Sequence, residues 1–294
     1  MSDPGLLAAR GARNDLRFRE AVFRGALYLS VAVGVIALIT LIIQVLVKGW
    51  PALNWGIVSN FPSSLPSKAG AQSAVWGTIW LIGIVAVITM PLGVAAAIYL
   101  EEYANKDRWW NRAIEINIQN LAAVPSIVYG ILGLAFFVRG PFGQGQVLIA
   151  GGLTLALLVL PIVIISAREA IRSVPPSIRE GSLALGATKL QTIGRQVLPG
   201  AIPGIATGSI LALSRAIGEA APLVLLGALT FITFNPDGLD SAFTALPIQI
   251  FNWISRPQED FKVLAAAAIV VLLVILLAMN ATAIWLRNRY QRKW

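Results

Sequence analysis

Six apolar segments, each long enough to cross a lipid bilayer, constrain the fold of this chain more than any other feature. They are Ala26–Val47, Ser73–Tyr99, Ala113–Val138, Val147–Ala167, Ala206–Phe231 and Val263–Trp285. A helix of about 20 apolar residues crosses the hydrocarbon core. Lipid offers no hydrogen-bond partners, so each segment must satisfy its own backbone groups as an α-helix. The sequence therefore predicts an all-α, multi-pass membrane protein, a bundle of about six transmembrane helices.

Composition agrees with this prediction and excludes several kinds of chemistry. The 294 residues are 57% hydrophobic and only 13% charged, whereas soluble domains carry roughly a quarter charged residues. The chain has no cysteine and no histidine, which excludes disulfides, thiol chemistry and the usual metal ligands. A catalytic role is therefore poorly supported, and we expect no metal site. The net charge of +9 comes from basic residues that flank the apolar segments, which argues against a nucleic-acid partner.

The distribution of basic residues predicts the topology. The arginine-rich start, the charged loop after the second span, the loop after the fourth span and the end of the chain lie on one side, which predicts that both termini are cytoplasmic. The first span lacks a small-x-small cleavage site, so we expect it to be retained rather than removed as a signal peptide. The predicted segments are a basic tail (1–24), the first span with an external loop (25–70), a helical core (71–286) containing a loop at 175–200, and a second basic tail (287–294).

The loop at 175–200 predicts two short helices separated by a turn. Ser177 precedes Glu180 by three residues and Thr188 precedes Gln191 by three, and both pairs have the form of a helix capping box. Gly186 lies between them and can adopt the left-handed conformation that ends the first helix. A surface hairpin without a partner remains an alternative. A DNA-reading helix-turn-helix is disfavoured because membrane spans tether both ends.

An arginine and a glutamate lie inside the predicted fifth span. Arg215 and Glu219 are four residues apart, so both side chains are expected on one helix face. One interpretation is a structural pair that neutralises itself. The other is that Arg215 lines a substrate path and binds an oxyanion, with Glu219 orienting its guanidinium. Arg168, at the end of the fourth span, is a candidate second station for the anion, or a residue that meets lipid headgroups.

Polar residues also occur in the predicted third span, which holds Glu115, Asn117, Gln119 and Asn120, with Pro125 in its middle. Polar groups inside a span usually face the interior of a bundle or a water-filled path, so this span is expected to line one. No Walker-A sequence occurs in the chain. If ATP drives this protein, the nucleotide is bound by another chain.

Residues of the 175–200 loop resemble the EAA signature of ABC importer permeases of the MetI-like family. Glu180, Gly181 and Ser182 stand where that signature begins, Gly186 falls at its glycine and Leu198-Pro199 at its closing pair. Gly181 and Ser182 replace two alanines, which is a change between small residues. The resemblance implies a type I importer fold and a coupling helix that docks on an ATPase. The implied coupling residues are Glu180, Gly181, Ser182, Leu185, Gly186, Ala187 and Lys189.

Two further stretches resemble phosphate-specific (Pst) ABC importer permeases. They are LSRAIGEAAPL at Leu213–Leu223 and TALPIQIFNWISRP at Thr244–Pro257, and the second resembles the PstA-type subunit family. The resemblance implies phosphate import, with Arg215, Glu219 and Arg168 on the substrate path. It also implies a PstC-type second permease, two PstB-type ATPases that bind ATP and Mg, and an external PstS-type phosphate-binding protein. A permease for sulfate or molybdate, an ion-coupled carrier working alone and a membrane-embedded enzyme are the alternatives.

Overall fold

The protein, as described by a computed structural model, is almost entirely helical. The structure describes residues 4–105, 107–140, 143, 145–228 and 231–290, and no strand forms within these ranges. The outermost residues of the two predicted tails, 1–3 and 291–294, lie outside the described residues. The all-α prediction is confirmed.

Five helices in the described part of the chain are long and apolar enough to cross a membrane, and a bent pair can form a sixth crossing. The five are α1 (Pro4–Gly49), α3 (Gln72–Ile98), α6 (Leu148–Arg172), α9 (Leu198–Gly218) and α12 (Glu259–Tyr290), and the bent pair is α4 (Trp109–Ala123) with α5 (Ser126–Gly133). The shorter elements are η1 (Trp50–Ala52), α2 (Gly56–Ser59), η2 (Pro66–Lys68), η3 (Tyr99–Tyr103), η4 (Leu134–Val138), α7 (Pro176–Ala184), α8 (Lys189–Thr192), η5 (Ile193–Val197), α10 (Ala221–Leu226) and α11 (Leu246–Ile254).

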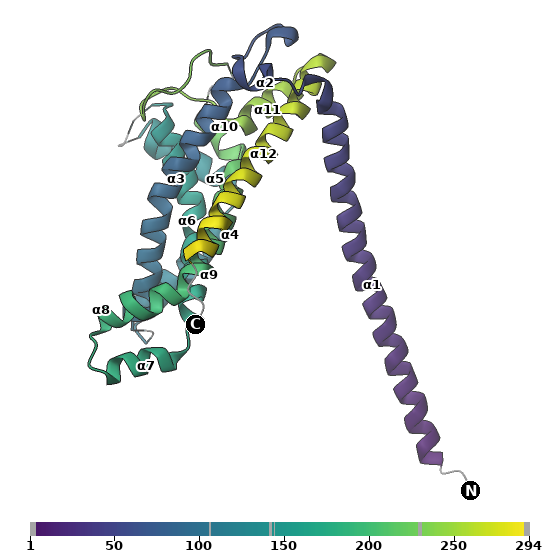
Figure 1. Cartoon of the computed structure of the whole chain (residues 1–294), viewed down its shortest axis with the longest axis vertical. Helices are drawn as coiled ribbons and strands as arrows, with labels where there is room; N and C mark the ends of the chain where they lie inside the picture. Colours follow the sequence, from purple (N-terminus) through teal and green to yellow (C-terminus); the bar gives the residue numbers. More distant parts are fainter. Residues whose placement is uncertain (1–3, 106, 141–142, 144, 229–230, 291–294) are drawn as a thin grey trace.

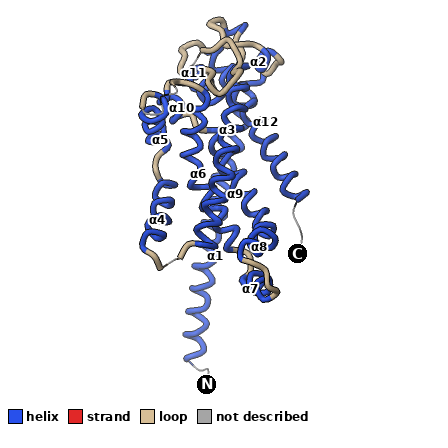
Figure 2. The backbone as a smooth tube through the Cα atoms, turned by 90° about the vertical axis from the view of Figure 1, so that its left-hand side faces the viewer, coloured by secondary structure: helices blue, strands red, loops and turns tan. Residues whose placement is uncertain are grey.

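The two ends of the bundle differ in what they carry. Figure 1 shows α7 and α8 at the end toward which the start of α1 and the end of α12 also point. At the opposite end lie α2 and α11, and Figure 2 shows the same arrangement from the side. The 175–200 loop, the start of α1 and the end of α12 therefore share one face, which the distribution of basic residues predicts to be cytoplasmic.

The third span, which the sequence predicted as one crossing over 113–138 with Pro125 in its middle, is broken into two helices next to this proline. Helix α4 ends at Ala123, and the segment Ser126–Val138 leaves it at an angle of 102°. Val124 has an extended backbone (φ −66°, ψ 133°), as expected for a residue that precedes proline. The hydroxyl of Tyr129 donates a hydrogen bond to the carbonyl of Leu121 at 2.8 Å, which supports the break from the side of α5.

The predicted bounds of the fifth span, 206–231, are wrong at both ends. A continuous helical run extends from Lys189 to Gly218, so α8 leads through η5 directly into α9. The helix then stops, because Glu219 has an extended backbone with ψ 103°. Helix α10 follows and ends at Gly227, which has a left-handed backbone with φ +81°. The fifth span is therefore a long helix that starts in the loop, plus a short separate helix.

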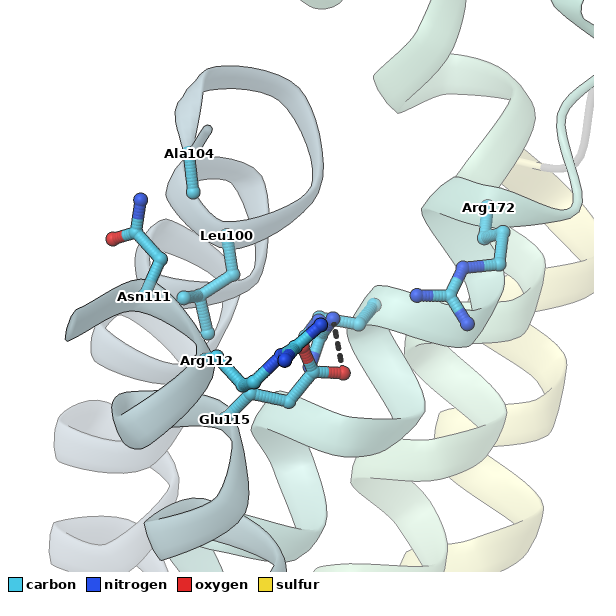
Figure 3. A pocket seen from close by; sticks show the side chains of 7 residues that line it. Leu100, Ala104, Asn111, Arg112, Glu115 and Arg172 are labelled. Atoms are coloured by element: carbon cyan, nitrogen blue, oxygen red, sulfur yellow. Dashed lines mark hydrogen bonds and ion pairs between the residues drawn. The ribbon is translucent and has the colours of Figure 1, made fainter. Parts of the chain in front are cut away.

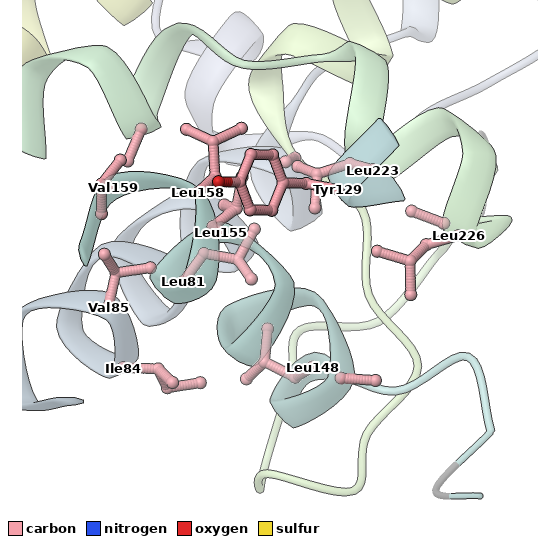
Figure 4. Close-up of a cluster of buried hydrophobic side chains, with 14 of the residues drawn as sticks. Leu81, Ile84, Val85, Tyr129, Leu148, Leu155, Leu158, Val159, Leu223 and Leu226 are labelled. Atoms are coloured by element: carbon pink, nitrogen blue, oxygen red, sulfur yellow. The ribbon is translucent and has the colours of Figure 1, made fainter. Parts of the chain in front are cut away.

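The core is formed by α3, α6 and α9, with α6 as the most buried span. The largest cluster of buried apolar side chains joins α3, α6 and α10 to Tyr129 of α5, and Figure 4 shows its members close together. A second cluster joins α11 and α12 to the start of α3. A third joins α6 to the start of α9 near the 175–200 loop. These contacts hold the two broken spans against the centre of the bundle.

Helix α1 differs from the others because its apolar surface is uncovered. None of its most apolar stretch is buried, and Figure 1 shows it leaning away from the bundle. Its last residue, Gly49, lies against the backbone of Ala266 in α12. Most of α1 is thus available to lipid or to another membrane protein.

Gly77 in α3 provides a test of how the segment that contains Thr244, just before α11, packs on the bundle. A Cβ at this position would lie 1.9 Å from the carbonyl oxygen of Thr244, and the neighbouring Thr78 hydroxyl accepts a hydrogen bond from the Leu246 amide at 2.9 Å. We expect Gly77→Ala to lower the free energy of unfolding by about 1–3 kcal/mol, because the backbones must separate. Thermal denaturation of the purified protein measures this change. Gly83 lies in the same helix, and a methyl group added there would meet no atom within 4 Å, so Gly83→Ala should leave the midpoint unchanged or raise it slightly, because alanine favours the helix. Equal midpoints for the two variants would refute this docking.

Candidate functional site

The 175–200 loop forms the predicted helical hairpin. Helix α7 and helix α8 are separated by Gly186, whose φ of +84° confirms the predicted left-handed turn. The capping box of Thr188 and Gln191 is present in both directions. The capping box predicted for Ser177 and Glu180 is wrong, because α7 starts at Pro176 with Pro175 at its cap and no side-chain bond. The hydroxyls of Ser182 and Thr192 lie 2.9 Å apart and join the two helices.

The hairpin presents apolar side chains to its surroundings. Leu185 is 90% exposed and Leu190 is 72% exposed. Beside them is a hollow of about 440 Å³ whose lining includes Gly181, Ser182 and Ala187. Of the predicted coupling residues, five are exposed and two are half-buried; the exposed ones are Glu180, Gly181, Leu185, Gly186 and Lys189, and the half-buried ones are Ser182 and Ala187. An exposed apolar patch beside a hollow is typical of a protein-binding surface.

Two glycines of the hairpin are expected to respond differently to an added methyl group. Gly186 needs its left-handed backbone, which costs an alanine about 1–2 kcal/mol. Gly181 lies within α7, and a Cβ added there would meet no atom within 4 Å, so alanine should stabilise the helix by about 0.5–1 kcal/mol. Hydrogen exchange of the α7 and α8 amides measures both effects. We expect faster exchange in Gly186→Ala and slower exchange in Gly181→Ala. The same direction of change in both would contradict this description of the turn.

Arg179 bonds the hairpin to the bundle. The sequence spacing did not predict this contact. The Nε and Nη2 of Arg179 donate to Oε1 of Glu102 at 3.0 and 2.8 Å. Its Nη1 and Nη2 also donate to the carbonyls of Val174 and Ile171 at 2.6 and 2.8 Å. The Glu102 side chain, in η3 at the end of α3, is only 9% exposed. The hairpin is therefore bonded to the loop-side end of α3 as well as being continuous with α6 and α9.

Arg215 and Glu219 form the predicted ion pair, although they do not share a continuous helix. Arg215 Nε lies 3.3 Å from Glu219 Oε1, across the point where α9 ends. The Arg215 side chain is 45% exposed, whereas that of Glu219 is 18% exposed. Arg215 also lies close enough to the buried Tyr129 for an electrostatic interaction. In the single chain, one side of the Arg215 guanidinium is therefore exposed, and the other side is bound by the Glu219 carboxylate.

Arg168 is separate from that pair. Its side chain is 7% exposed, and its Nη2 lies 2.9 Å from Glu115 Oε1 and 3.6 Å from Glu101 Oε2. Gly204 and Gly208 of α9 approach Ala170 and Ser166 of α6, which places Arg168 level with that part of α9. Arg215 is seven residues beyond Gly208, roughly 10 Å further along the helix. The structure therefore does not bring Arg168 to Arg215, and gives it two carboxylate partners that spacing alone did not identify.

Comparison with known proteins gives a consistent set of relatives. The model of the family described as binding-protein-dependent transport system inner membrane component matches residues 89–292. The phosphate transport system permease protein PstA 1 of Mycobacterium tuberculosis (strain CDC 1551 / Oshkosh) is 32% identical over 276 residues, covering 92% of this chain and 89% of that protein. The probable ABC transporter permease protein YqgI of Bacillus subtilis (strain 168) is 31% identical over 289 residues, covering 94% and 98%.

Solved structures share the fold at lower identity. A bacterial alginate ABC transporter, in complex with an alginate pentasaccharide-bound periplasmic protein, matches with a TM-score of 0.69 at 16% identity, covering 95% of this chain and 98% of that one. The MetNI methionine ABC transporter, in an inward-facing conformation, matches with a TM-score of 0.56 at 18% identity, covering 74% and 95%. Identity at this level is evidence of a shared fold alone.

Proposed function

The chain belongs to the family of binding-protein-dependent transport system inner membrane components, and from this premise we propose that it imports inorganic phosphate as the permease subunit of an ATP-driven transporter. Its fold is that of type I ABC importer permeases, and it is a multi-pass protein of the cell membrane. The identification of phosphate is the proposed step. It is supported by relatives named phosphate transport system permease, which are 32% and 31% identical to this chain.

The observation that carries the proposal is the half-exposed Arg215 paired with Glu219 at the break after α9. A charged side chain inside a span is costly and usually marks a substrate path. The guanidinium presents a planar set of donors that suits a tetrahedral oxyanion. With Nε directed to Glu219, the remaining nitrogens of Arg215 are available to an anion.

Glu219 gives the pair a preference among oxyanions. Near neutral pH, phosphate keeps at least one O–H group, which can donate a hydrogen bond to a carboxylate oxygen. Sulfate is fully ionised and has no such donor, so the carboxylate repels it. A carboxylate beside the arginine therefore favours phosphate over sulfate, while an arginine alone would favour both.

The uncovered surfaces of the chain fit the expected partners. Arg215 is open on one side and α1 is unpacked, so a second permease subunit of the PstC type would complete the path and cover the helix. Asn117, Gln119 and Asn120 of α4 are exposed as well and need polar surroundings inside a membrane. The apolar hairpin is suited to docking on one of two PstB-type ATPases, which bind ATP and Mg²⁺. A PstS-type protein would deliver phosphate from outside.

Reconstitution with these partners tests the proposal. The chain is purified together with the second permease and the ATPase, and ATP hydrolysis is measured with the phosphate-loaded binding protein. We expect phosphate to stimulate hydrolysis and to accumulate inside the vesicles. Stimulation by sulfate or molybdate instead would identify another oxyanion as the substrate. Uptake driven by an ion gradient without any ATPase would refute the importer mechanism.

The Glu219→Gln variant tests the selectivity step. The amide is neutral and no longer repels a dianion, so we expect the preference for phosphate over sulfate to fall by about tenfold, which corresponds to one charge-assisted hydrogen bond. Competition of sulfate with labelled phosphate uptake measures this ratio. Asp237→Asn, an exposed carboxylate in the external loop, serves as the control. An unchanged preference in Glu219→Gln would remove the carboxylate from the selectivity mechanism.

A further inference from the structure

Tyr129 supplies a hydrogen bond that Pro125 cannot make in the broken third span. In a continuous helix, the carbonyl of Leu121 would accept a hydrogen bond from the backbone N–H of the residue four positions later. That residue is Pro125, which has no backbone N–H. The hydroxyl of Tyr129 donates to this carbonyl at 2.8 Å instead, beside the Val124 amide at 3.1 Å. A side chain of α5 therefore satisfies the end of α4.

The ring of Tyr129 packs against the helices on both sides of the break in the fifth span. The residue is only 5% exposed and belongs to one buried cluster with Ala216 of α9 and Leu223 of α10. Figure 4 shows the ring close to Leu223. The next residue, Gly130, approaches α10 so closely that an added Cβ would lie 2.7 Å from Pro222 Cα. Tyr129 thus bonds to one broken span and packs against the other.

Arg215 lies next to these contacts. It precedes the buried Ala216 in α9, and its guanidinium interacts electrostatically with Tyr129. The hydroxyl hydrogen of Tyr129 is used by the Leu121 carbonyl, so the phenol oxygen can offer only its lone pairs to a cation. The interaction with the guanidinium is therefore attractive. Two neighbours thus act on the guanidinium, the Glu219 carboxylate through Nε and the Tyr129 phenol.

The other end of α4 is held by a separate bond. Near the start of the helix, Oε1 of Glu115 accepts a hydrogen bond from Nη2 of Arg168 in α6 at 2.9 Å (Figure 3). Removing the Tyr129 hydroxyl leaves this bond in place and releases only the end of α4 at the break. A change in transport caused by that removal can therefore be assigned to the break beside Arg215.

We propose that Tyr129 is a positioning residue for anion transport and acts through Arg215. Its hydroxyl holds the end of α4 at the break, its oxygen attracts the guanidinium, and its ring keeps α10 in contact with α5. A guanidinium that is already positioned loses less conformational freedom when it binds an anion, which favours binding. This inference rests on the proposed function, because it takes Arg215 to be on the substrate path.

Phosphate uptake by Tyr129→Phe in the reconstituted transporter tests this role. The phenylalanine ring fills the same space, and basal ATP hydrolysis shows whether the variant assembles. We expect uptake at low phosphate concentration to fall about tenfold, because a buried hydrogen bond and a contact with the guanidinium are lost. Thr154→Val is the matched control. Thr154 is buried against Gly133 of α5, and its hydroxyl donates to the Ala150 carbonyl at 2.8 Å. This control should transport within about twofold of the wild type.

The variant Arg215→Lys separates a positioning role from a purely structural one. If Tyr129 acts through the guanidinium, Tyr129→Phe/Arg215→Lys should transport within about twofold of Arg215→Lys alone, whereas losses at independent sites multiply. Multiplied losses, an equal loss in Thr154→Val, normal uptake in Tyr129→Phe or loss of its basal hydrolysis would each overturn the proposal.

The same experiment distinguishes failure of this inference from failure of the proposed function. Phosphate uptake by the wild type, together with multiplied losses in the double variant, would count against Tyr129 alone. Uptake of sulfate or molybdate in place of phosphate would show that the proposed substrate is wrong. The same variants, tested with that anion, would still decide the role of Tyr129. Uptake of none of these anions would overturn both proposals.

Discussion

Phosphate uptake by the reconstituted transporter is expected to fall about 100-fold when Arg215 is replaced by glutamine. The variant loses the charged donors that bind the anion. It also leaves Glu219, which is only 18% exposed, as an unpaired negative charge beside the path. Removing one partner of such a pair costs about 2–5 kcal/mol, much of it from the charge that remains. The rate of labelled phosphate uptake at low substrate concentration measures the loss.

The double variant Arg215→Gln/Glu219→Gln separates the two contributions. It removes the unpaired carboxylate, so we expect it to transport phosphate better than Arg215→Gln although more slowly than the wild type. Arg215→Lys keeps the charge and loses the planar fork, and an intermediate loss of about tenfold is expected. Arg287→Gln removes a half-buried arginine of α12 that donates to Thr207, and should transport normally. Uptake within about twofold of the wild type in Arg215→Gln would remove this residue from the path.

The membrane fold follows from the sequence because lipid leaves a chain few choices. Long apolar segments must be helical, so the existence and order of the spans were predictable. The hairpin was predictable as well, because Gly186 and Thr188 determine the backbone conformation of residues adjacent to them in the sequence. The breaks in the third and fifth spans were missed, although each has a local signal. Pro125 forces Val124 out of the helical region, and Pro222 lies in the first turn of α10 just after the helix stops at Gly218.

The contacts of the candidate site were less predictable, because most join residues far apart in the chain. The pair of Arg215 and Glu219 follows from a spacing of four and was predicted. Glu115 is 53 positions from Arg168, and Glu102 is 77 positions from Arg179. No spacing rule connects such residues. Their pairing depends on how α3, α4 and α6 pack, which also decides that the guanidinium of Arg168 is buried rather than directed to lipid headgroups.

The partly buried pair of Arg179 and Glu102 is expected to be essential for coupling. Arg179→Gln leaves Glu102, at 9% exposure, without its partner, and removes the guanidinium donors to the carbonyls of Ile171 and Val174. Breaking a buried ion pair from one side costs about 3–5 kcal/mol. The hairpin then remains continuous with α6 and α9, and loses its bonds to the end of α3. We expect phosphate uptake to fall by at least about tenfold.

The pattern of ATP hydrolysis distinguishes lost coupling from lost folding. If the bond to α3 transmits the movement of the hairpin, Arg179→Gln should keep its basal hydrolysis and lose its stimulation by phosphate. The double variant Arg179→Gln/Glu102→Gln should recover part of the stimulation, because the unpaired carboxylate is gone. Glu169→Gln is the control, since it removes only an exposed pair with Arg172, whose contribution is about 0–1 kcal/mol.

Two routes lead from the hairpin toward Arg215, and the Arg179 variants decide between them. One route is the continuous helix from Lys189 to Gly218, which ends at the Arg215 and Glu219 pair. The other passes through Glu102 into α3, which packs on α6 and α9 in the core. Normal stimulation in Arg179→Gln would show that the continuous helix transmits the movement by itself. Lost stimulation with intact basal hydrolysis would show that the continuous helix is not sufficient. The bond between Arg179 and Glu102 would then be required as well, because without it the hairpin could move while α3 stays in place.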